Sequence, residues 1–346
     1  MISDRYNLKN LLGVVSNPIK LLTELRNLKT LTELKFNNYV TKNHFEKKYG
    51  SGINIMQKDW DNLIILDACR YDIFKKHNIF SGELSRVVSP GGHSKEFYEK
   101  GFPNSPYHDS VMVTANPYTS VVAQDYFHDI VTTYTGERII ESNSRVESVS
   151  NNGKVIEAGH VNNVHPKRVN EISIDQYEKN PNKRLIIHYL QPHDPYFGTK
   201  AKELRNKFRK QGFEFSYWTD HSSIEDDKNV VNGLMTLATR GYISDDVLKE
   251  VYEENLKFVL EYVADIVDEL SGKTVITSDH GELLGEKVAG KQFFHYEGIY
   301  SSELRHVPWL SIEGDKRRQI TKEGPQSHDK IDDKAVDEHL QMLGYK

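Results

Sequence analysis

The stretch Leu63-Ile64-Ile65-Leu66 is apolar throughout, follows the polar pair Asp61-Asn62 and leads into Asp67. An apolar run of this length between polar residues is typical of a strand that is buried on both faces of a parallel sheet. Ligands gather at the carboxyl ends of such strands, where Asp67 stands. The stretch therefore predicts a buried parallel strand that presents a carboxylate at its end.

Three further runs have the same character, and each leads into a polar residue. They are Val111-Met112-Val113-Thr114 before Asn116, Leu185-Ile186-Ile187 before His188, and Thr274-Val275-Ile276-Thr277 before Asp279. Ahead of the last run, apolar residues at helical spacing predict a long helix over residues 245–270, closed by Ser271-Gly272. Helices that precede buried strands are typical of an α/β fold with a mostly parallel central sheet.

The composition is that of a globular protein and excludes several classes of function. The 346 residues are 37% hydrophobic and 27% charged, which is enough for a sizeable core. A net charge of −5 leaves no basic excess to neutralise a phosphate backbone, so we expect no nucleic-acid partner. Cys69 is the single cysteine, which excludes an internal disulfide and a zinc site built from cysteines.

The same features bear on where the protein is expected to act. The longest apolar run near the N-terminus, Leu11 to Val15, is too short for a signal sequence. No window approaches the ~20 apolar residues of a membrane span. We therefore expect a cytoplasmic location, either free or at the inner membrane surface.

Residues 1–55 differ from the rest and are expected to form a helical appendage. Within residues 1–50, nine basic residues stand against four acidic ones, so the segment carries a net charge of +5. Leucines at near-helical spacing between Pro18 and Phe36 predict an amphipathic helix. Such a helix either packs on the remaining domain with its lysines solvated or rests on an anionic membrane surface.

Residues 56–346 are expected to form one α/β domain that carries an insertion or lid at 199–243. That segment has little periodic pattern and is rich in charged and aromatic residues. Residues 315–334 are strongly charged and predict a surface excursion, and residues 335–343 predict a short closing helix.

Asp67 and the pair Asp279-His280 end two predicted strands that are more than 200 residues apart. A parallel sheet brings strand ends to one edge, so we expect two carboxylates and an imidazole to meet there. Such a set suits a divalent cation. Oxygen ligands favour manganese, magnesium or calcium, and the imidazole shifts the preference towards zinc or manganese. An Asp-His pair after a strand also occurs as a plain hydrogen-bonded turn, so the surrounding sequence has to decide.

Three strings in those surroundings resemble a known family. They are Ile64-Ile65-Leu66-Asp67-Ala68-Cys69-Arg70-Tyr71-Asp72, His188-Tyr189-Leu190-Gln191-Pro192-His193-Asp194-Pro195-Tyr196 and Thr277-Ser278-Asp279-His280-Gly281-Glu282-Leu283-Leu284-Gly285-Glu286. In residues and in order along the chain they resemble the sulfatase-like branch of the alkaline phosphatase superfamily, over roughly residues 60–346. The resemblance implies an alkaline-phosphatase-like α/β/α sandwich.

In that superfamily an aspartate at the first strand, a nucleophile on the next segment and a late Asp-His pair hold a metal together. Carried over, the resemblance implies that Asp67, Ser94, Asp279 and His280 bind one divalent ion, which is manganese, zinc, calcium or magnesium.

Ser94 is the expected nucleophile within the string that runs from Val88 to Phe97. Gly91-Gly92 permits a close approach of the backbone, and residues from Lys95 onward can begin a helix whose N-terminus stabilises an anion. Ser89 is the second choice. A plain N-cap role for Ser94 is the structural alternative.

The chain departs from true sulfatases, which carry a Cys/Ser-x-Pro-x-Arg string whose first residue becomes formylglycine. Neither Cys69 nor Ser89 begins such a string, because Arg70 follows the first directly and Pro90 the second. An unmodified serine suits phosphoryl transfer. The chain is in this respect more similar to the phosphodiesterase and phosphoethanolamine-transferase branches.

Further residues are assigned to the substrate by the same resemblance. His193 and His295 stand where relatives have substrate-binding histidines, and either is expected to bind the substrate or to protonate the leaving group. Arg70 is expected to hold the anion, with a structural salt bridge to Asp72 as the alternative. His188 is expected either to bind the substrate or to be a buried, hydrogen-bonded histidine.

A second metal, held by His193, Asp194 and His295, would make the protein a two-metal phosphodiesterase. One metal is favoured over two, because the ligands of two-metal relatives are not all visible in the sequence.

Together these features predict a metal-dependent hydrolase or transferase of phosphate esters that works through a covalent intermediate on Ser94. The expected substrate is a small-molecule, glycan-linked or lipid-linked ester of phosphate or sulfate. Two alternatives stay open. One is a sulfuric ester hydrolase that acts on a glycan or small molecule without formylglycine, and the other is a catalytically silent protein that binds a glycan or a partner.

Overall fold

The computed structural model describes residues 40–103, 106–116, 118–119, 123, 126–133, 164–215, 229–231, 233–288 and 291–325. By their contacts these residues form two units, one of 40–50 with 298–300 and one of all the others. Each unit is described by itself. The helices expected at 18–36 and 335–343 lie outside the described residues.

The described part of the smaller unit is a helix over residues 40–49 with an aromatic cluster. Phe45 is buried, with its ring centroid 4.9 Å from that of Tyr49 and 6.1 Å from that of Tyr300. The ammonium of Lys42 lies 5.9 Å from the centre of the Tyr300 ring. The division of the chain into an appendage and a catalytic domain at residue 55 stays a prediction.

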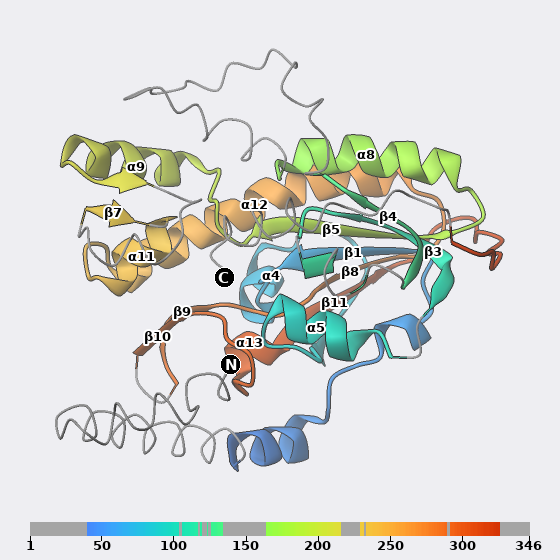
Figure 1. Ribbon diagram of the computed structural model, residues 1–346, viewed down its shortest axis with the longest axis horizontal. Helices are drawn as coiled ribbons and strands as arrows, with labels where there is room; N and C mark the ends of the chain where they lie inside the picture. Colours follow the sequence, from blue (N-terminus) through green and yellow to red (C-terminus); the bar gives the residue numbers. More distant parts are fainter. Residues whose placement is uncertain are drawn as a thin grey trace, which may run out of the picture. The chain divides into compact units, whose positions relative to one another are not determined.

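The larger unit is built on a seven-stranded sheet with the strand order β2-β11-β8-β1-β5-β3-β4 (Figure 1). The strands are β1 (Asn62–Asp67), β2 (Glu83–Val88), β3 (Tyr107–Thr114), β4 (Phe127–Thr132), β5 (Arg184–Pro192), β8 (Thr274–Ser278) and β11 (His306–Ile312). Strands β8, β1, β5, β3 and β4 pair in parallel, whereas β11 pairs antiparallel with β8 and β2. The four apolar runs lie in β1, β3, β5 and β8, which confirms the predicted α/β fold with a mostly parallel sheet.

The helices and the smaller strands complete the larger unit. They are η1 (Ile55–Gln57), α4 (Tyr71–His77), α5 (Ser94–Gly101), α8 (Pro166–Lys179), α9 (Thr199–Lys210), α11 (Gly233–Thr239), α12 (Asp245–Glu269), α13 (Ser302–Arg305), the antiparallel pair β9 (Leu283–Lys287) and β10 (Lys291–Phe294), and the parallel pair β6 (Glu214–Phe215) and β7 (Val230–Val231). The predicted long helix is α12, which begins where the Ser244 hydroxyl accepts from the amide of Val247. Among the described residues, no helix is both long enough and apolar enough to span a bilayer.

The side chains of β1 alternate between two hydrophobic layers. Leu63 and Ile65 pack in one cluster with Phe97 of α5, and Ile64 and Leu66 pack in another with the apolar face of α12. Figure 1 shows α8 and α12 along one face of the sheet and α5 on the other. The arrangement is the predicted α/β/α sandwich.

The expected insertion at 199–243 contains α9, β6, β7 and α11 in its described part. Phe208, Phe215 and Leu234 from these elements are buried in the same cluster as α12, so the segment packs on the domain. Whether it acts as a lid stays a prediction. The described part of the charged tail, residues 315–325, is largely exposed.

Candidate active site

Polar side chains from four neighbouring strands meet at one edge of the sheet. Asp67 ends β1, and Asp279 and His280 follow β8, which pairs with β1 so that Leu66 lies opposite Ser278. On the other side of β1, β5 carries His188 and β3 is followed by Asn116. All of the site side chains named here are buried. The sheet order therefore brings together groups that are more than 200 residues apart in the sequence.

The turn after β1 fixes the approach of Asp67 to Asp279. Ala68 has a φ of 58°, a left-handed conformation that is uncommon for a residue other than glycine. Two hydrogen bonds hold it there: its amide donates to Asp279 Oδ1 at 3.0 Å, and its carbonyl accepts from the Tyr252 hydroxyl at 2.6 Å. The backbone of one strand end thus positions the carboxylate of the other.

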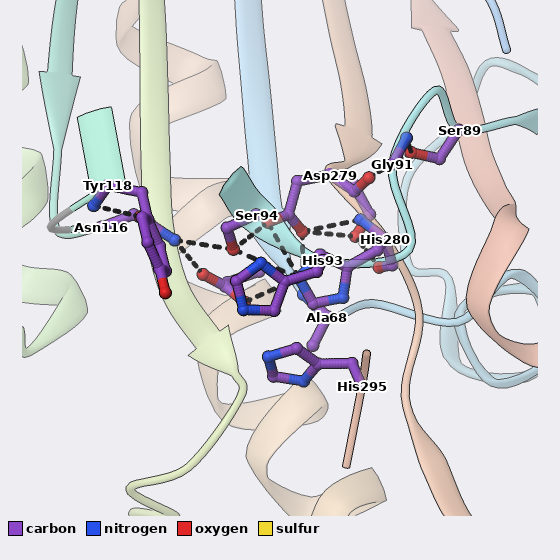
Figure 2. A network of polar contacts seen from close by, with 12 residues as sticks. Ala68, Ser89, Gly91, His93, Ser94, Asn116, Tyr118, Asp279, His280 and His295 are labelled. Atoms are coloured by element: carbon purple, nitrogen blue, oxygen red, sulfur yellow. Dashed lines mark hydrogen bonds and ion pairs between the residues drawn. The ribbon is translucent and has the colours of Figure 1, made fainter. Parts of the chain in front are cut away.

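Ser94, the first residue of α5, places its hydroxyl among these groups. Its Oγ donates to Asp279 Oδ2 at 2.7 Å, lies 3.2 Å from His280 Nε2 and accepts from Asn116 Nδ2 at 3.0 Å. Figure 2 shows Ser94 between Asn116 on one side and Asp279 with His280 on the other. The N-cap of α5 is His93, whose Nδ1 accepts from the amide of Lys95. The N-cap alternative for Ser94 is therefore not what the structure shows.

The loop before Ser94 is shaped by close backbone contacts. A Cβ atom added at Gly91 would lie 2.4 Å from the amide nitrogen of Phe97, so this position requires glycine. The hydroxyl of Ser89, the second choice for the nucleophile, bonds the carbonyl oxygen of Asp279 and accepts from the amide of Gly91 at 3.1 Å. Ser89 thus holds the loop, and Ser94 faces the cluster.

A buried ion pair supports the same loop from behind. Glu96 of α5 accepts from the amide of Gly92 at 2.9 Å and pairs with the guanidinium of Arg305 at 2.8 Å and 2.9 Å. The side chains of Glu96 and Arg305 are only 1% and 2% exposed. Arg305 also donates to the carbonyl of Pro90 at 2.8 Å. The position of Ser94 therefore depends on a charge pair formed with α13.

The two buried carboxylates of the cluster behave differently. Burial raises the pKa of Asp67, and the charge of Asp279 raises it further. Burial opposes ionisation of Asp279 as well, but the neighbouring His280 holds the pKa of Asp279 below its usual range. For His280, burial lowers the pKa, whereas the charges of Asp279 and Asp67 raise it, and the result is about 9. Without a cation, the imidazolium of His280 therefore balances the charge of Asp279.

The donor set fits a divalent cation. Asp67, Asp279 and His280 offer ligand atoms that all lie within 4.8 Å of one another. Asp67 Oδ1 is buried and has no hydrogen-bond partner, which is costly for a carboxylate oxygen unless a cation compensates it. Two carboxylates and an imidazole beside the Ser94 hydroxyl are the oxygen and nitrogen donors that zinc and manganese accept.

A second group of possible ligands lies next to the first. His193, Glu282 and His295 offer ligand atoms within 4.8 Å of one another. The ring centroid of His295 lies 4.4 Å from that of His280 and 5.2 Å from that of His193. His295 Nδ1 is hydrogen-bonded to a carboxyl oxygen of Glu282 at 3.1 Å, and His193 Nδ1 donates to the carbonyl of Asp194 at 2.5 Å. Both expected substrate histidines therefore stand beside the Ser94 cluster.

Asp194 does not take the place that sequence reasoning gave it. Its Oδ1 accepts from the amide of Tyr196 at 3.0 Å, and Glu282 is the carboxylate that joins His193 and His295. The carboxylate of Asp194 stabilises its own turn. Burial raises its pKa to about 7.

Arg70 is held by carboxylates of the chain itself. Its Nη2 lies 2.7 Å from Asp72 Oδ2, and its Nη1 lies 2.5 Å from Glu286 Oε1. A further bond runs from Nη1 to the carbonyl of Glu282 at 3.4 Å. These pairs are the salt bridges that the structural alternative expects, and the role of Arg70 in anion binding stays a prediction.

His188, the other expected substrate ligand, is fully buried inside β5. Its Nδ1 is hydrogen-bonded to the Tyr98 hydroxyl at 2.5 Å. Its Nε2 lies 3.8 Å from Asp67 Oδ2 and 3.8 Å from Asp279 Oδ2. The side chain therefore faces the carboxylates from inside the protein, as in the buried alternative.

Sequence reasoning assigned no role to three residues that the structure places at the site. Asn116 donates to Asp67 Oδ2 at 2.6 Å as well as to Ser94, and Glu282 contacts His295. The ring of His93 lies 5.3 Å from that of His295. A signal existed for each, because Asn116 ends a predicted strand, Glu282 lies inside a string quoted for the resemblance, and His93 directly precedes Ser94.

No protein-family model matches the sequence, and no curated protein matches it either. Solved structures do match. The soluble domain of lipooligosaccharide phosphoethanolamine transferase A from Neisseria meningitidis is 12% identical, with 73% of this chain and 76% of that one covered and a TM-score of 0.41. The C-terminal periplasmic domain of phosphoethanolamine transferase EptC from Campylobacter jejuni is 13% identical, with coverages of 77% and 83% and a TM-score of 0.40.

A third match is a protein in the alkaline phosphatase superfamily from Vibrio parahaemolyticus, 14% identical, with coverages of 83% and 67% and a TM-score of 0.36. These are the families that the sequence strings resemble. With TM-scores below 0.5, the likenesses carry no conclusion about the reaction of this chain, which has to be argued from its own side chains.

The expected cytoplasmic location is wrong on these comparisons, because a similar structure is described as a periplasmic domain of a transferase. The prediction rested on the lack of a long apolar run in the sequence, and that lack does not determine where a protein acts.

Proposed function

We propose that this protein is a metal-dependent enzyme that transfers or hydrolyses a phosphate ester through a covalent intermediate on Ser94. The observation that carries the proposal is the set of three contacts to the Ser94 hydroxyl. Asp279 accepts a hydrogen bond from it, His280 Nε2 lies within 3.2 Å, and Asn116 donates to the oxygen. A serine that serves only as structure does not need a carboxylate, an imidazole and an amide around one hydroxyl.

Asp67, Ser94, Asp279 and His280 would hold the cation. One divalent ion is proposed, with zinc or manganese favoured over calcium or magnesium because an imidazole is among the ligands. When bound, the ion supplies positive charge that lowers the pKa of the serine hydroxyl and neutralises a phosphoryl oxygen.

The chain's own groups account for the first half of the reaction. The Ser94 proton leaves along its hydrogen bond to Asp279 Oδ2 while Oγ forms a bond to phosphorus. The bond from phosphorus to the ester oxygen breaks, and that oxygen takes up a proton as it departs. The product is a phosphoserine at Ser94. Asn116 keeps Oγ in line throughout, because its amide bonds both Ser94 and Asp67.

His193 and His295 are proposed to serve the entering and leaving oxygens. Glu282 bonds Nδ1 of His295, so Nε2 is the nitrogen that exchanges a proton with the substrate, in the manner of a base oriented by a carboxylate. In the second half, water or an acceptor alcohol gives its proton to an imidazole as its oxygen bonds to phosphorus. The bond from phosphorus to Ser94 Oγ breaks, and Oγ takes back its proton from Asp279. Water gives hydrolysis, and an alcohol gives transfer.

Phosphate is proposed over sulfate because of the nucleophile. The proposed nucleophile, Ser94, is an unmodified serine, and the sequence lacks the string in which a residue becomes formylglycine. The same fully formed cluster disfavours a silent binding protein, since buried acidic groups are expensive to keep without a use.

The test compares purified wild-type protein with Ser94→Ala on an aryl phosphate, an aryl phosphodiester and an aryl sulfate, each with zinc or manganese supplied. We expect phosphate or phosphodiester turnover that Ser94→Ala lowers by about 10³-fold or more, and a phosphorylated Ser94 peptide in the mass spectrum of quenched wild-type reactions.

Ser85→Ala is the matched control, because Ser85 is exposed on β2 and bonds only a carbonyl of β11. Turnover of the sulfate alone, or an equal rate in Ser94→Ala and wild type, would contradict the proposal. Metal analysis of the same protein counts the ions. A second equivalent that disappears in Glu282→Ala would show that His193, Glu282 and His295 bind metal and not only substrate.

A further inference from the structure

Two histidines face the same pair of carboxylates from different sides. His280 comes from the loop after β8, and His188 comes from inside β5. His280 Nε2 lies 3.2 Å from Asp279 Oδ2, whereas His188 Nε2 lies 3.8 Å from one oxygen of each carboxylate. Both rings are fully buried. What each ring can do depends on which of its nitrogens carries a proton, and the partner of the far nitrogen decides that.

The far nitrogen of His280 points to a backbone carbonyl. Its Nδ1 lies 2.8 Å from the carbonyl oxygen of Gly281, which can only accept a hydrogen bond. Nδ1 of His280 is therefore a donor. In the neutral ring, Nε2 then carries a lone pair towards the carboxylates, which is what a metal ligand requires.

The far nitrogen of His188 has the opposite kind of partner. Thr119 Oγ1 donates to the hydroxyl oxygen of Tyr98 at 2.7 Å, which leaves the Tyr98 proton for Nδ1 of His188 at 2.5 Å. Tyr98 is fully buried, so no water competes for that proton. Nδ1 of His188 is then an acceptor, and the ring proton stands on Nε2.

The surroundings of Nε2 agree with this assignment independently. Nε2 of His188 is buried and has no hydrogen-bond partner, and the groups it faces at equal distance are Asp67 Oδ2 and Asp279 Oδ2. A lone pair aimed at two carboxylate oxygens would be repelled, whereas an N–H group is attracted to both.

We propose that His188 is a positioning residue that directs its Nε2–H group between Asp67 and Asp279, with its tautomer fixed by Tyr98 and Thr119, and that it is not a metal ligand. The inference rests on the proposed metal site and adds to it. Of two histidines with similar surroundings, the inference makes His280 a metal ligand and His188 a hydrogen-bond donor. The donor holds the two carboxylates at a fixed spacing before any cation arrives.

The first test reads the tautomers directly in wild-type protein. The protein is labelled with nitrogen-15 in histidine, and the His188 signals are identified as those lost in His188→Gln among the 15 histidines of the chain. We expect a proton on Nε2 of His188 in metal-free protein and the same proton after loading with Zn²⁺ alone. A proton on Nδ1, or loss of the Nε2 proton on loading with Zn²⁺, would overturn the inference.

Tyr98→Phe tests how the tautomer is fixed. It removes the hydroxyl and keeps the ring, which packs against Phe97 and Phe102. We expect His188 to show a mixture of tautomers in this variant. Tyr107→Phe, in the same aromatic cluster, is the control and should leave the His188 signals unchanged. A single Nε2 tautomer that persists in Tyr98→Phe would overturn the role given to Tyr98.

Zn²⁺ affinity separates a donor from a ligand at residue 188. The amide of His188→Gln can offer an N–H where Nε2 stands, whereas His188→Leu offers none. We expect His188→Leu to weaken Zn²⁺ binding about 10- to 100-fold and His188→Gln to restore most of it. Equal losses in the two variants would contradict the inference. If wild-type protein does not bind Zn²⁺ at all, the proposed function fails, whereas the tautomer of metal-free protein still tests the inference by itself.

Discussion

Asn116 connects Ser94, the proposed nucleophile, to a proposed metal ligand through a single amide group. Its Nδ2 bonds Ser94 Oγ and Asp67 Oδ2, and its Oδ1 accepts from the amide of Tyr118 at 2.9 Å. The last bond orients the amide, so the nitrogen is the end that faces the site. Asn116 therefore holds Ser94 Oγ and Asp67 Oδ2 in fixed positions. In the proposed reaction it takes part in no bond that forms or breaks.

Asn116→Ala should slow the reaction while the protein stays folded. Loss of a donor that holds the attacking oxygen is expected to lower kcat about 100-fold with a smaller change in KM. Steady-state kinetics on the best phosphate ester measure both. Asn78→Ala, which removes an amide that bonds only the nearby Phe80, is the control. A normal kcat in Asn116→Ala would show that Ser94 needs no such support.

At this scale the sequence predicts some contacts and not others. Asp67, Asp279 and His280 end separate strands, so their meeting follows from the topology once the sheet is recognised. The salt bridges of Arg70 do not follow from the sequence. Side-chain directions decide whether its guanidinium contacts a substrate or the carboxylates of Asp72 and Glu286. The roles of the site residues themselves stay predictions until they are measured.

Between the residue and the whole fold, the loop before α5 is the element that depends most on a single pair of charges. Glu96 and Arg305 are buried together, and Glu96 also bonds Gly92 and Lys100. Removal of one partner leaves the other charge buried without compensation, which is costly. We therefore expect the loop before α5 to lose its conformation when the pair of Glu96 and Arg305 is broken.

Glu96→Gln is expected to lower the free energy of unfolding by about 3 to 5 kcal/mol at pH 7, measured by denaturant unfolding. Burial raises the pKa of Glu96, but Arg305 and Lys100 lower it to about 2, against the usual 4.5. The stability that the pair contributes is thus complete above about pH 4.5 and is lost as the pH falls towards 2.

The difference between wild type and Glu96→Gln should shrink accordingly between pH 5 and pH 2. Glu99→Gln, on the same helix but with its side chain 43% exposed, should change stability very little and serves as the control. A constant difference across that pH range would mean that the cost of the substitution is steric and not ionic.

Sequence patterns identify the buried elements of this fold better than the edge elements. Four strands are recognisable because both of their faces are apolar. Strand β2 is half-exposed along most of its length, and it reads Glu83-Leu84-Ser85-Arg86-Val87-Val88 with no apolar run. Its pairing with β11, and the antiparallel direction of β11, depend on tertiary contacts that no local pattern reports.

For the molecule as a whole, the buried acidic centre should make stability depend on metal. Burial and the charge of Asp279 both oppose ionisation of Asp67 in metal-free protein, and a bound cation would offset that cost. Removal of metal by a chelator should lower the melting temperature, and Zn²⁺ or Mn²⁺ at 100 times its Kd should restore about 3 kcal/mol.

Thermal unfolding with and without the chelator measures this effect. Asp67→Asn removes a proposed ligand of the cation, so its melting temperature should not respond to the chelator. A melting temperature of the wild type that responds neither to chelator nor to added metal would argue against a cation at this site.

The central place of β1 in the sheet has a consequence for how the protein is made. Its two neighbours, β5 and β8, begin 122 and 212 residues after β1 begins, at Arg184 and Thr274. Until the ribosome has made β5, neither neighbour of β1 exists, and until it has made the loop after β8, Asp67 lacks Asp279 and His280. Cation binding at the proposed site would therefore have to wait until translation has passed His280, and a nascent chain released before that point would hold only part of the proposed ligands.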